Sequence, residues 1–502
     1  MTRSAADVVV AGAGIAGLSA ALAARAAGAS VIVLERAPRA ERGGNTRFSN
    51  GAMRAVYADV HDLERWTGPI DPAQKARTTF GSYSRQRYLD DMAHITGGRT
   101  DPTLCADLVD QSAATLDWLA AHGVPFAPLY AWQFQAPDGR ITFQGGSAVE
   151  AGGGGEGLSA ALFAAARRGG IDVRTDARAV ALARGADGIT GIVVDEAGRQ
   201  REIAAGAVVL ACGGFEADAG LRVRHLGPAW AAAKVRGSRF NTGDGLRMAL
   251  EIGAQPAGDW SGCHSASWDA GAPDVNALAH GTVFKRDDFM YGIVVNAPGE
   301  RFFDEGADIR AVTYARLGRT ILAEPGHIAW QIFDAGTAHL LHDEYRAANA
   351  TRVVAGSLAE LARRCPGLDP EGLQATVEAF NRAVDTSVPF DPARKDGRST
   401  RGLAIAKSNW ARAIDTPPFA AYAVRAGITF TFGGVRVDGE ARVLDRAGAV
   451  IPGLFAAGEM VGGLFYANYP GGSGLIVGRG PGPPRRRSGS QTARQRLSPT
   501  AA

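Results

Sequence analysis

Residues 7–36 read DVVVAGAGIAGLSAALAARAAGASVIVLER, and this stretch decides the fold. A short apolar run is followed by a glycine-rich turn, an alanine-rich segment and a second apolar run that ends at Glu35. The change from a continuous apolar pattern to a helical one and back predicts a strand, a helix and a second strand. Together they form one βαβ unit, whose two strands pair in parallel.

The turn of this unit has the spacing Gly12-x-Gly14-x-x-Gly17. The first glycine permits a tight turn, the second lets the backbone approach a pyrophosphate, and the third lets the helix pack closely on the strand. The N-terminus of the helix favours the phosphate charge, and Glu35 suits a carboxylate that binds a ribose. A plain glycine turn is the alternative, but the flanking strands and the acid favour dinucleotide binding.

Other segments predict that the same parallel sheet continues far along the chain. Residues 152–182 contain another glycine-led helix and strand, and residues 206–218 contain a buried strand that breaks at two glycines. Residues 453–463 repeat the order of strand, glycine turn and acid. We therefore expect one α/β domain built from both ends of the sequence. An insertion at 259–427, with a proline-led amphipathic helix at 368–384, is expected to close over the cofactor.

Composition excludes several classes of protein. The chain of 502 residues predicts two domains. Its net charge of +3 comes from five arginines after residue 480, so the rest of the chain gives no electrostatic reason to expect nucleic acid. Four dispersed cysteines do not have the spacing of a disulfide framework, an iron–sulfur cluster or attached haem, and we expect no metal site. No apolar run is long enough to span a membrane and no signal peptide is evident, so we expect a cytoplasmic location.

Six motifs in order resemble the flavoprotein family of fumarate reductases and succinate dehydrogenases. They are the βαβ unit, GGNTRFSNGAMR (43–54), VVLACGGF (208–215), NTGDG (241–245), VVNAPGERFFDE (294–305) and GLFAAGE (453–459). Within that family, FTFGG (430–434) and NYPGG (468–472) are similar to the tricarballylate dehydrogenase branch. The resemblance implies an α/β fold: a Rossmann-like FAD-binding domain of the glutathione-reductase type, at 1–258 and 428–480, with an inserted α+β capping domain at 259–427.

The resemblance also implies which residues bind FAD. They are Gly12, Gly14, Ile15, Ala16 and Gly17 around the pyrophosphate, Glu35 and Arg36 near the ribose, Gly44, Asn45, Thr46 and Gly51 towards the flavin, Val180 and Asp244 towards the adenine, Gly213, Glu459 on the ribityl chain, and Ser473, Gly474 and Leu475 at a helix that starts near the flavin pyrimidine. Membrane-bound relatives attach the flavin through a histidine at the position of Asn45. We therefore expect FAD to be bound non-covalently.

For catalysis, the resemblance implies hydride exchange with the flavin and a side chain that carries the proton. In the family this side chain is an arginine soon after the R-F-x-x-E segment, and Arg310 is the nearest candidate, although one inserted residue is needed to align it. A surface or ion-paired arginine is the alternative for Arg310. His264 takes the place of a histidine that touches substrate, and a core histidine bonded to backbone is its alternative.

The stretch RAGITFTFGG (425–434) lacks the histidine that fumarate reductases carry there, and Tyr469 stands where they carry an arginine. Loss of an arginine removes the group best shaped to bind a carboxylate, so fumarate and succinate are poor substrate guesses. Thr429, Tyr466 and Tyr469 are the expected substrate-binding residues. Four cations could supply charge in the inserted lobe or could simply be solvated: Arg236, Arg239, Lys285 and Arg286.

We therefore expect an FAD-dependent dehydrogenase that oxidises a C–C single bond in a small carboxylic acid, with tricarballylate as the best guess. The alternatives are an enzyme like fumarate reductase or 3-ketosteroid dehydrogenase, a flavoprotein of the precorrin-3B synthase type, and a flavin-binding electron carrier without a substrate of its own. A separate protein or quinone-linked partner is expected to accept the electrons. The Arg- and Pro-rich tail at 481–502 does not fit the family, and a reading-frame error or a disordered extension would explain it.

Overall fold

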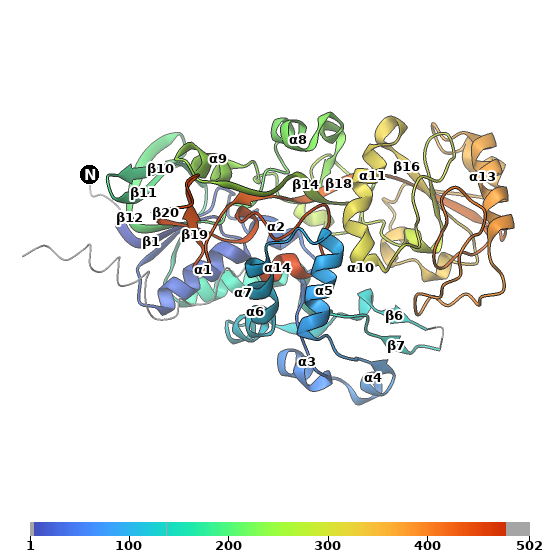
Figure 1. The fold of residues 1–502 in the computed structure, drawn as a ribbon, viewed down its shortest axis with the longest axis horizontal. Helices are drawn as coiled ribbons and strands as arrows, with labels where there is room; N and C mark the ends of the chain where they lie inside the picture. Colours follow the sequence, from blue (N-terminus) through green and yellow to red (C-terminus); the bar gives the residue numbers. More distant parts are fainter. Residues whose placement is uncertain (1–4, 137, 478–502) are drawn as a thin grey trace, which may run out of the picture.

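The computed structural model describes residues 5–136 and 138–477. The predicted tail at 481–502 lies outside these residues. The molecule is elongated, with the strands and helices of the N-terminal part at one end and the inserted lobe at the other (Figure 1). Among the described residues, no helix is both long enough and apolar enough to cross a membrane.

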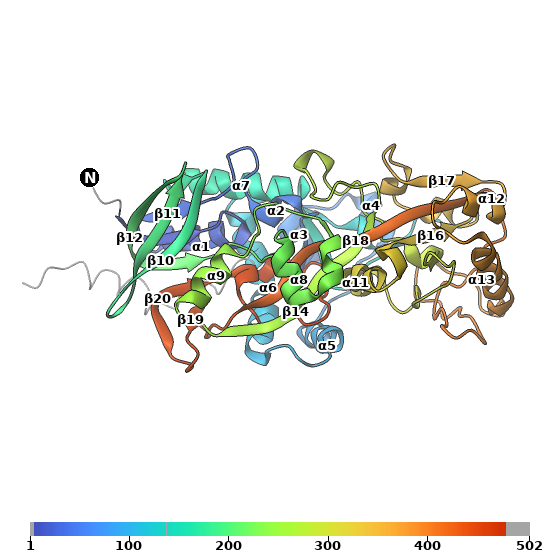
Figure 2. The same cartoon turned by 90° about the horizontal axis from the view of Figure 1, so that it is seen from above.

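The βαβ unit forms as the glycine pattern predicts. Strand β1 (Ala5–Ala11) leads into helix α1 (Ile15–Ala26), and β2 (Val31–Leu34) returns beside β1 in parallel. All four residues of β2 are buried, as expected for a strand inside a covered parallel sheet. Helix α7 (Gly154–Arg168) packs beside α1 (Figure 2).

The main sheet takes strands from both ends of the chain, as the sequence predicts. It has eight strands, and its central order is β10-β11-β12-β1-β2-β9, with β20 beside β12 and β19 beside β20. The later strands are β9 (Asp172–Arg174), β10 (Ala177–Gly185), β11 (Gly188–Glu196), β12 (Arg199–Leu210), β19 (Arg442–Leu444) and β20 (Val450–Ala456). Because β20 pairs in parallel with β12, the C-terminal segment completes the sheet that begins at Ala5.

Two long strands connect this part of the molecule to the inserted lobe. β14 (Pro256–Asp269) and β18 (Phe419–Val435) pair in antiparallel fashion and run side by side between the two parts (Figures 1 and 2). The expected domain boundaries at 258 and 427 fall inside these strands. The chain therefore passes between the lobes through paired strands, and a site between the lobes is built on rigid elements.

The lobe itself contains the rest of the second sheet and several short helices. The other strands of this sheet are β13 (Lys234–Val235), which precedes the insertion, and β15 (Ile293–Val295), β16 (Ala329–Phe333) and β17 (Arg352–Ala355). Its helices are α10 (Arg310–Thr313), α11 (Leu317–Leu322), α12 (Leu358–Arg363) and α13 (Pro370–Ala383). Helix α13 confirms the proline-led amphipathic helix: Asp369 accepts hydrogen bonds from the backbone of its first turn, and Leu373, Val377 and Phe380 are buried.

The remaining elements surround the pocket or cover the main core. The helices are α2 (Gly44–Phe48), α3 (Val60–Thr67), α4 (Pro72–Ala76), α5 (Arg85–Thr96), α6 (Pro102–Ala121), α8 (Ala219–Leu226), α9 (Asp244–Glu251) and α14 (Ser473–Val477). Two small sheets are formed by β3 (Ala52–Arg54), β8 (Ser147–Ala151) and β5 (Phe126–Pro128), and by β4 (Thr78–Thr79), β7 (Ile141–Thr142) and β6 (Phe134–Gln135).

Candidate active site

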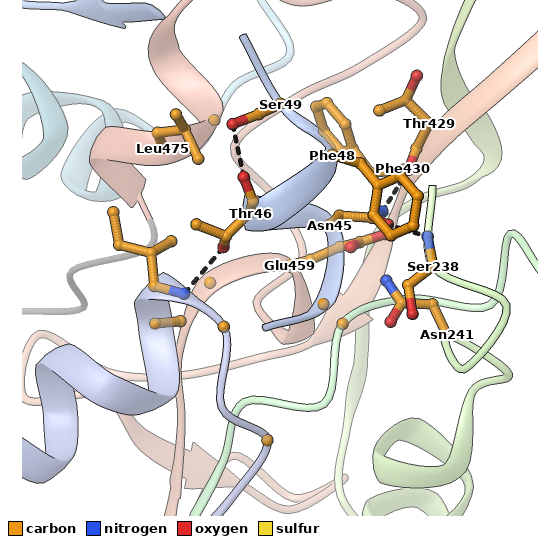
Figure 3. Close-up of a pocket in the computed structure, with 18 of the residues that line it drawn as sticks. Asn45, Thr46, Phe48, Ser49, Ser238, Asn241, Thr429, Phe430, Glu459 and Leu475 are labelled. Carbon is orange, nitrogen blue, oxygen red and sulfur yellow. Dashed lines mark hydrogen bonds between the residues drawn. The ribbon is translucent and has the colours of Figure 1, made fainter. Parts of the chain in front are cut away.

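A single pocket, here called the central pocket, is lined by segments of both lobes. The N-terminal part contributes residues of the β1–α1 turn, the end of β2 and helix α2, and the C-terminal part contributes residues between 457 and 475. The inserted lobe and the connecting strands contribute Arg236, His264, Lys285, Asp287, Tyr314 and 429–432. Figure 3 shows part of this lining, with Asn45, Phe430 and Glu459 close together.

Packing leaves no room for side chains at two of the three motif glycines. A Cβ on Gly12 would lie 2.2 Å from the carbonyl oxygen of Ala211, and a Cβ on Gly17 would lie 1.9 Å from that of Gly12. At Gly14 the nearest heavy atom to such a Cβ is Oγ1 of Thr46, at 3.3 Å. Gly12 and Gly14 line the pocket with Ile15 and Ala16, while Gly17 supports the turn from behind. This division of roles is what the motif requires.

Glu35 stands at the end of β2 and lines the same pocket. Its Oε2 accepts a hydrogen bond from the backbone N–H of Ala13 at 3.2 Å, and its Oε1 accepts one from Ala37 at 2.9 Å. Burial raises the pKa of Glu35, and these backbone hydrogen bonds oppose that rise. The carboxyl group is thus fixed beside the glycine turn, where the sequence places a ribose ligand.

The expected adenine end of the pocket is organised around Asp244. This carboxylate pairs with Arg36 at 3.0 Å and with Arg178 at 2.7 Å, and all three residues line the pocket. Val180 does not line it: the carbonyl of Val180 accepts a hydrogen bond from Arg247 at 2.9 Å, at an irregular point of β10. The neighbouring residues 177–179 occupy the pocket wall in its place.

Helix α2 brings Gly44, Asn45 and Thr46 to the pocket. Thr46 Oγ1 accepts a hydrogen bond at 2.9 Å from the backbone N–H of Ile15, which joins α2 to the start of α1 (Figure 3). Gly51 lies outside the lining, and a Cβ there would be 2.9 Å from the backbone of Gly154. Gly51 therefore serves close packing against α7.

The amide of Asn45 is fully engaged by the protein. Its Nδ2 donates at 2.6 Å to Glu216 Oε1. The same Nδ2 donates at 2.6 Å to the carbonyl of Thr429, and Oδ1 accepts from the backbone of Ser238 at 2.8 Å (Figure 3). Asn45 therefore ties helix α2 to β18 and to the segment at 236–241.

Two carboxyl groups, Glu216 and Glu459, lie beside Asn45. Oε1 of Glu216 also accepts from Asn241 at 2.6 Å, and Oε1 of Glu459 accepts from the backbone N–H of Thr431 at 2.7 Å. Burial raises the pKa of both groups, and that of Glu459 reaches about 7. Because the two acids repel each other when both are charged, the pair holds a proton at neutral pH.

Gly213 and two residues of α14 complete the expected cofactor side. Gly474 and Leu475 line the pocket, and so does Gly213, where a Cβ would lie 2.7 Å from Nδ2 of Asn241. Ser473 lies behind them, with its Oγ 2.8 Å from the hydroxyl of Tyr88.

The other side of the pocket is aromatic and holds a pair of tyrosines. The hydroxyls of Tyr314 and Tyr469 are hydrogen-bonded at 2.5 Å. The ring of His264 lies 5.1 Å from Tyr314 and 5.0 Å from Tyr469 between centroids, and it stacks on Phe430 at 5.4 Å. His264 and Phe430 face each other in the register of β14 and β18, so the connecting strands build this wall.

Burial sets the protonation of these groups. It raises the pKa of Tyr314 and of Tyr469, while the positive charge of Arg236 lowers both. Burial and the same charge hold the pKa of His264 well below its ordinary value, so its imidazole is neutral. Among the described residues, neither ring nitrogen of His264 nor Oγ1 of Thr429 has a hydrogen-bond partner.

The structure separates the other substrate-side candidates. Tyr466 lies outside the lining, beneath the guanidinium of Arg99 at 4.9 Å. Arg236 and Lys285 line the pocket, whereas Arg239 pairs with Glu41 and Arg286 with Asp269. The last two cations therefore serve ion pairs outside the pocket.

Arg310 is not among the residues that line the central pocket. Its Nη1 pairs with Asp288 at 3.1 Å, and its Nη2 donates to the carbonyl of Ala131 at 3.1 Å. His342 shares Asp288 at 2.7 Å. Burial would raise the pKa of Asp288, but the hydrogen bonds from His342 and the charge of Arg310 bring it to about 2. This geometry matches the ion-paired alternative for Arg310, and the expectation that Arg310 carries the proton stays a prediction.

Sequence reasoning missed Tyr314, Glu216 and Asp287, all of which are buried beside the candidates. Tyr314 follows Arg310 by four residues, which is about one helical turn. A search for tyrosines downstream of the R-F-x-x-E segment would have found it. Glu216 follows the GGF motif directly, but its sequence position carries no sign of the buried pair that it forms with Glu459.

The residues of the central pocket fit FAD. The backbone at Gly14 is open to the pocket, Glu35 is fixed where a ribose belongs, and the start of α1 lines the pocket, where a helix N-terminus favours phosphates. The aromatic wall and the tyrosine pair lie on the other side of the same pocket. The arrangement can therefore hold a dinucleotide and place a second molecule beside the tyrosine pair.

Comparison with known proteins agrees with this fit. The family model described as FAD binding domain matches residues 7–476. The chain is 31% identical to 4-oxocyclohexanecarboxylate 2-dehydrogenase of Sinomonas cyclohexanicum, over 95% of this chain and 91% of that protein. It is 30% identical to a probable fumarate reductase of Shewanella frigidimarina, over 93% of this chain and 72% of that protein.

Among solved structures, the chain resembles 3-ketosteroid-Δ4-(5α)-dehydrogenase of Rhodococcus jostii. The TM-score is 0.69 with 27% identity, over 98% of this chain and 97% of that chain. Both the matched model and the relatives span nearly the whole described chain. The chain thus belongs to the fumarate reductase and succinate dehydrogenase flavoprotein family, and it is an FAD-dependent oxidoreductase that acts on CH–CH groups.

Proposed function

We propose that the chain moves two hydrogens across a C–C bond adjacent to a carbonyl or carboxyl group, and that the Tyr314–Tyr469 pair carries the proton. The observation that supports this is the 2.5 Å hydrogen bond between the two hydroxyls on the wall of the central pocket. FAD, when bound, supplies or accepts the hydride. The protein then has to position the substrate and move one proton.

A pair of hydrogen-bonded tyrosines can accept and donate a proton more easily than a single tyrosine. When one hydroxyl loses its proton, the other donates a hydrogen bond to the phenolate and stabilises it. The nearby charge of Arg236 also favours the phenolate, against the effect of burial. The pair therefore acts as the base when a C–C single bond is oxidised and as the acid when a double bond is reduced.

His264 and Thr429 are placed to bind the oxygen of a carbonyl group. A neutral imidazole has one N–H donor and one acceptor, and a threonine hydroxyl can donate. Neither of these side chains has a partner for the buried atoms concerned. Hydrogen bonds to a carbonyl oxygen stabilise the negative charge that develops when a proton leaves the neighbouring carbon.

The wall favours a substrate with a ring or an apolar body. Phe430, Phe432 and Phe465 line this side of the pocket beside the tyrosines. Tricarballylate would bring three carboxylates to these rings, and neither the family model nor the relatives above name it. An oxo acid of the kind named in the 31%-identical relative suits the wall better.

Reduction of an unsaturated acid is the second candidate function. The same tyrosine pair would then give a proton, and the 30%-identical relative is named a fumarate reductase. A ketosteroid-type substrate belongs to the same chemistry, and the likeness to the ketosteroid dehydrogenase covers nearly both chains. The precorrin-3B synthase type and a flavin-binding electron carrier stay as alternatives from the sequence.

We also propose that FAD is bound non-covalently and that a separate protein or a quinone takes the electrons. Asn45 stands where a linking histidine would be, and its amide is occupied by three hydrogen bonds to the protein. The electron acceptor and the cytoplasmic location stay predictions from the sequence.

The test is anaerobic absorbance of the flavin in the purified holoenzyme. We expect 4-oxocyclohexanecarboxylate or a related saturated oxo acid to bleach the flavin band, and we expect tricarballylate and succinate to bleach it much more slowly. If only the reduced flavin reacts, and with an unsaturated acid, the reductase is the function. If no acid or ketosteroid changes either form of the flavin, the chain is an electron carrier and the proposal fails. Acid precipitation should release the flavin into solution.

A further inference from the structure

Arg236 brings a guanidinium group into the central pocket without a protein partner. Among the described residues, none of the hydrogen bonds or ion pairs involves its side chain, and its buried Nη1 has no acceptor. Arg236 is half-buried, and a charge that is partly removed from water without a partner is costly, so proteins usually pair it. This side chain therefore needs an explanation that the fold alone does not supply.

The guanidinium is held in place by apolar packing. The backbone N–H of Arg236 donates to the carbonyl of Ile428 at 2.8 Å, which fixes the residue to β18. A Cβ on Gly427 would lie 2.8 Å from Cδ of Arg236, so this glycine makes room for the stem. The guanidinium carbon lies 4.6 Å from the ring centre of Trp268. An arginine that is held in this way loses little entropy when it binds a ligand.

Its charge reaches the groups that are proposed to react. Burial raises the pKa of Tyr314, Tyr469 and Asp287 and lowers that of His264, and the positive charge of Arg236 acts to lower all four. Each of these residues lines the pocket, and Oδ1 of Asp287 also has no partner. Arg236 therefore lies on the substrate side of the pocket, close to the tyrosine pair, and not at the glycine turn.

We propose that Arg236 binds a carboxylate of the substrate. The planar guanidinium matches a carboxylate with two parallel N–H···O bonds, and among the described residues of this wall no other side chain offers such a pair of donors. Tyr469 stands where the resemblance leads us to expect an arginine that binds a substrate carboxylate. Arg236, which directly follows β13, supplies that carboxylate-binding group instead. This inference rests on the proposed function and narrows it: the substrate is an acid that carries its carboxylate within reach of Arg236 while the tyrosine pair faces the reacting carbon.

Lys285 and Asp287 complete the surroundings of this subsite. Lys285 is buried, and its Nζ lies 3.7 Å from Glu344, so its charge is partly matched. Asp287 places a carboxyl group in the same region. A substrate with several carboxylates would meet Asp287 as well as the cations. The subsite therefore suits one carboxylate and not a cluster of them.

The experiment compares each acid with its methyl ester in the holoenzyme. The probes are 4-oxocyclohexanecarboxylate, fumarate and tricarballylate with their esters. Dissociation constants are measured from the shift of the oxidised flavin spectrum for probes that do not reduce the flavin, and from the concentration dependence of the anaerobic reduction rate for those that do. We expect at least one acid to bind about 10- to 100-fold more tightly than its ester, as for a charge-assisted hydrogen-bonded pair. In Arg236→Gln this preference should disappear, and in Arg236→Lys it should be partly kept.

Arg239→Gln is the matched control. It removes an arginine three residues away that pairs with Glu41 outside the pocket, and it should keep the full preference for the acid. Tyr314→Phe separates this inference from the proposed function: it should slow turnover and leave the preference for the acid unchanged. If neither the unmodified enzyme nor any variant turns over substrate, but the preference for the acid is still lost in Arg236→Gln, then the carboxylate subsite is supported although the proposed function is not.

Several results would overturn the inference. Equal binding of every acid and its ester by the unmodified enzyme would mean that Arg236 only balances the charge of Asp287. The same conclusion follows if Arg236→Gln keeps the preference. Loss of FAD from both Arg236→Gln and Arg236→Lys, with folding retained, would assign the arginine to the cofactor.

Discussion

Replacing Tyr314 by phenylalanine removes one hydroxyl of the buried pair and keeps the ring. The two hydroxyls are 2.5 Å apart, and both rings contact His264 edge to face. If the hydroxyl only contributed a hydrogen bond to the fold or to substrate binding, its loss would cost about 1 kcal/mol. A proton carrier contributes about 10²- to 10⁴-fold to the rate, which corresponds to about 3–5 kcal/mol of activation free energy.

The assay is the rate of flavin reduction by a saturating substrate in anaerobic stopped flow, with FAD content measured for each variant. We expect Tyr314→Phe and Tyr469→Phe each to slow this rate by at least 100-fold. The double variant should be no slower than the slower single variant, because groups that act as one unit are not additive. Tyr466→Phe, in the same segment as Tyr469 but outside the pocket, should react at nearly the full rate.

The rate of substrate oxidation should also depend on pH, because the proposed proton carriers are tyrosines. Burial raises the pKa of both tyrosines, so the rate of oxidation should keep rising with pH above neutrality. Arg236→Gln should move this rise to still higher pH. A rate for Tyr314→Phe within tenfold of the unmodified enzyme, or a double variant whose loss is the product of the two single losses, would refute a shared proton role.

Three further predictions test other parts of the site. Gly17→Ala should reduce FAD content and melting temperature, because its Cβ would lie 1.9 Å from a backbone oxygen, whereas Gly439→Ala, with no atom within 4 Å, should change neither. Arg310→Gln should lower the melting temperature, because Asp288 loses an ion-pair partner. The rate of flavin reduction should stay within about threefold of that of the unmodified enzyme, and a rate lower by about 100-fold would make Arg310 the proton carrier. Glu459 has a pKa of about 7 in the folded protein against an ordinary 4.5. Its contribution to stability is therefore present at low pH and is lost as the pH rises from about 4.5 through 7. The urea midpoint of Glu459→Gln should vary less over this pH window than that of the unmodified protein.

The cofactor side could be predicted because its signals are local. The glycine spacing specifies the turn, and the length of the βαβ unit carries Glu35 to the end of the second strand, so the residues around the pyrophosphate follow from the sequence. Val180 shows the limit of this approach. A register shift in β10 turns the wall towards 177–179 and leaves Val180 bonded to Arg247. A shift of one residue reverses the face of a strand, and nothing in the local pattern reports it.

The substrate side could not be predicted residue by residue, because it is assembled from distant segments. Arg236 lines the pocket and Arg239 does not; Tyr469 lines it and Tyr466 does not. The members of each pair are three residues apart and have the same chemistry, so the sequence offers no means of choosing. The choice is made by β18, which places Gly427 against the stem of Arg236 and Phe430 against His264.

The two sides of the pocket differ in how their polar atoms are satisfied, and this difference indicates what each side does. On the cofactor side, Asn45 and the carboxyl of Glu35 use their hydrogen bonds on the protein itself, so the cradle is rigid before any ligand binds.

On the substrate side, His264, Thr429 and Arg236 bury polar atoms that have no partner among the described residues. Each such atom costs about 1–3 kcal/mol, and few remain unpaired in folded proteins without a functional reason. A ligand with a carbonyl oxygen and a carboxylate would satisfy all three at once. It would recover in binding the free energy that the fold gives up at this wall. The aromatic stretch at 425–434 therefore contributes to chemistry mainly through the polar atoms that it holds unpaired and in place.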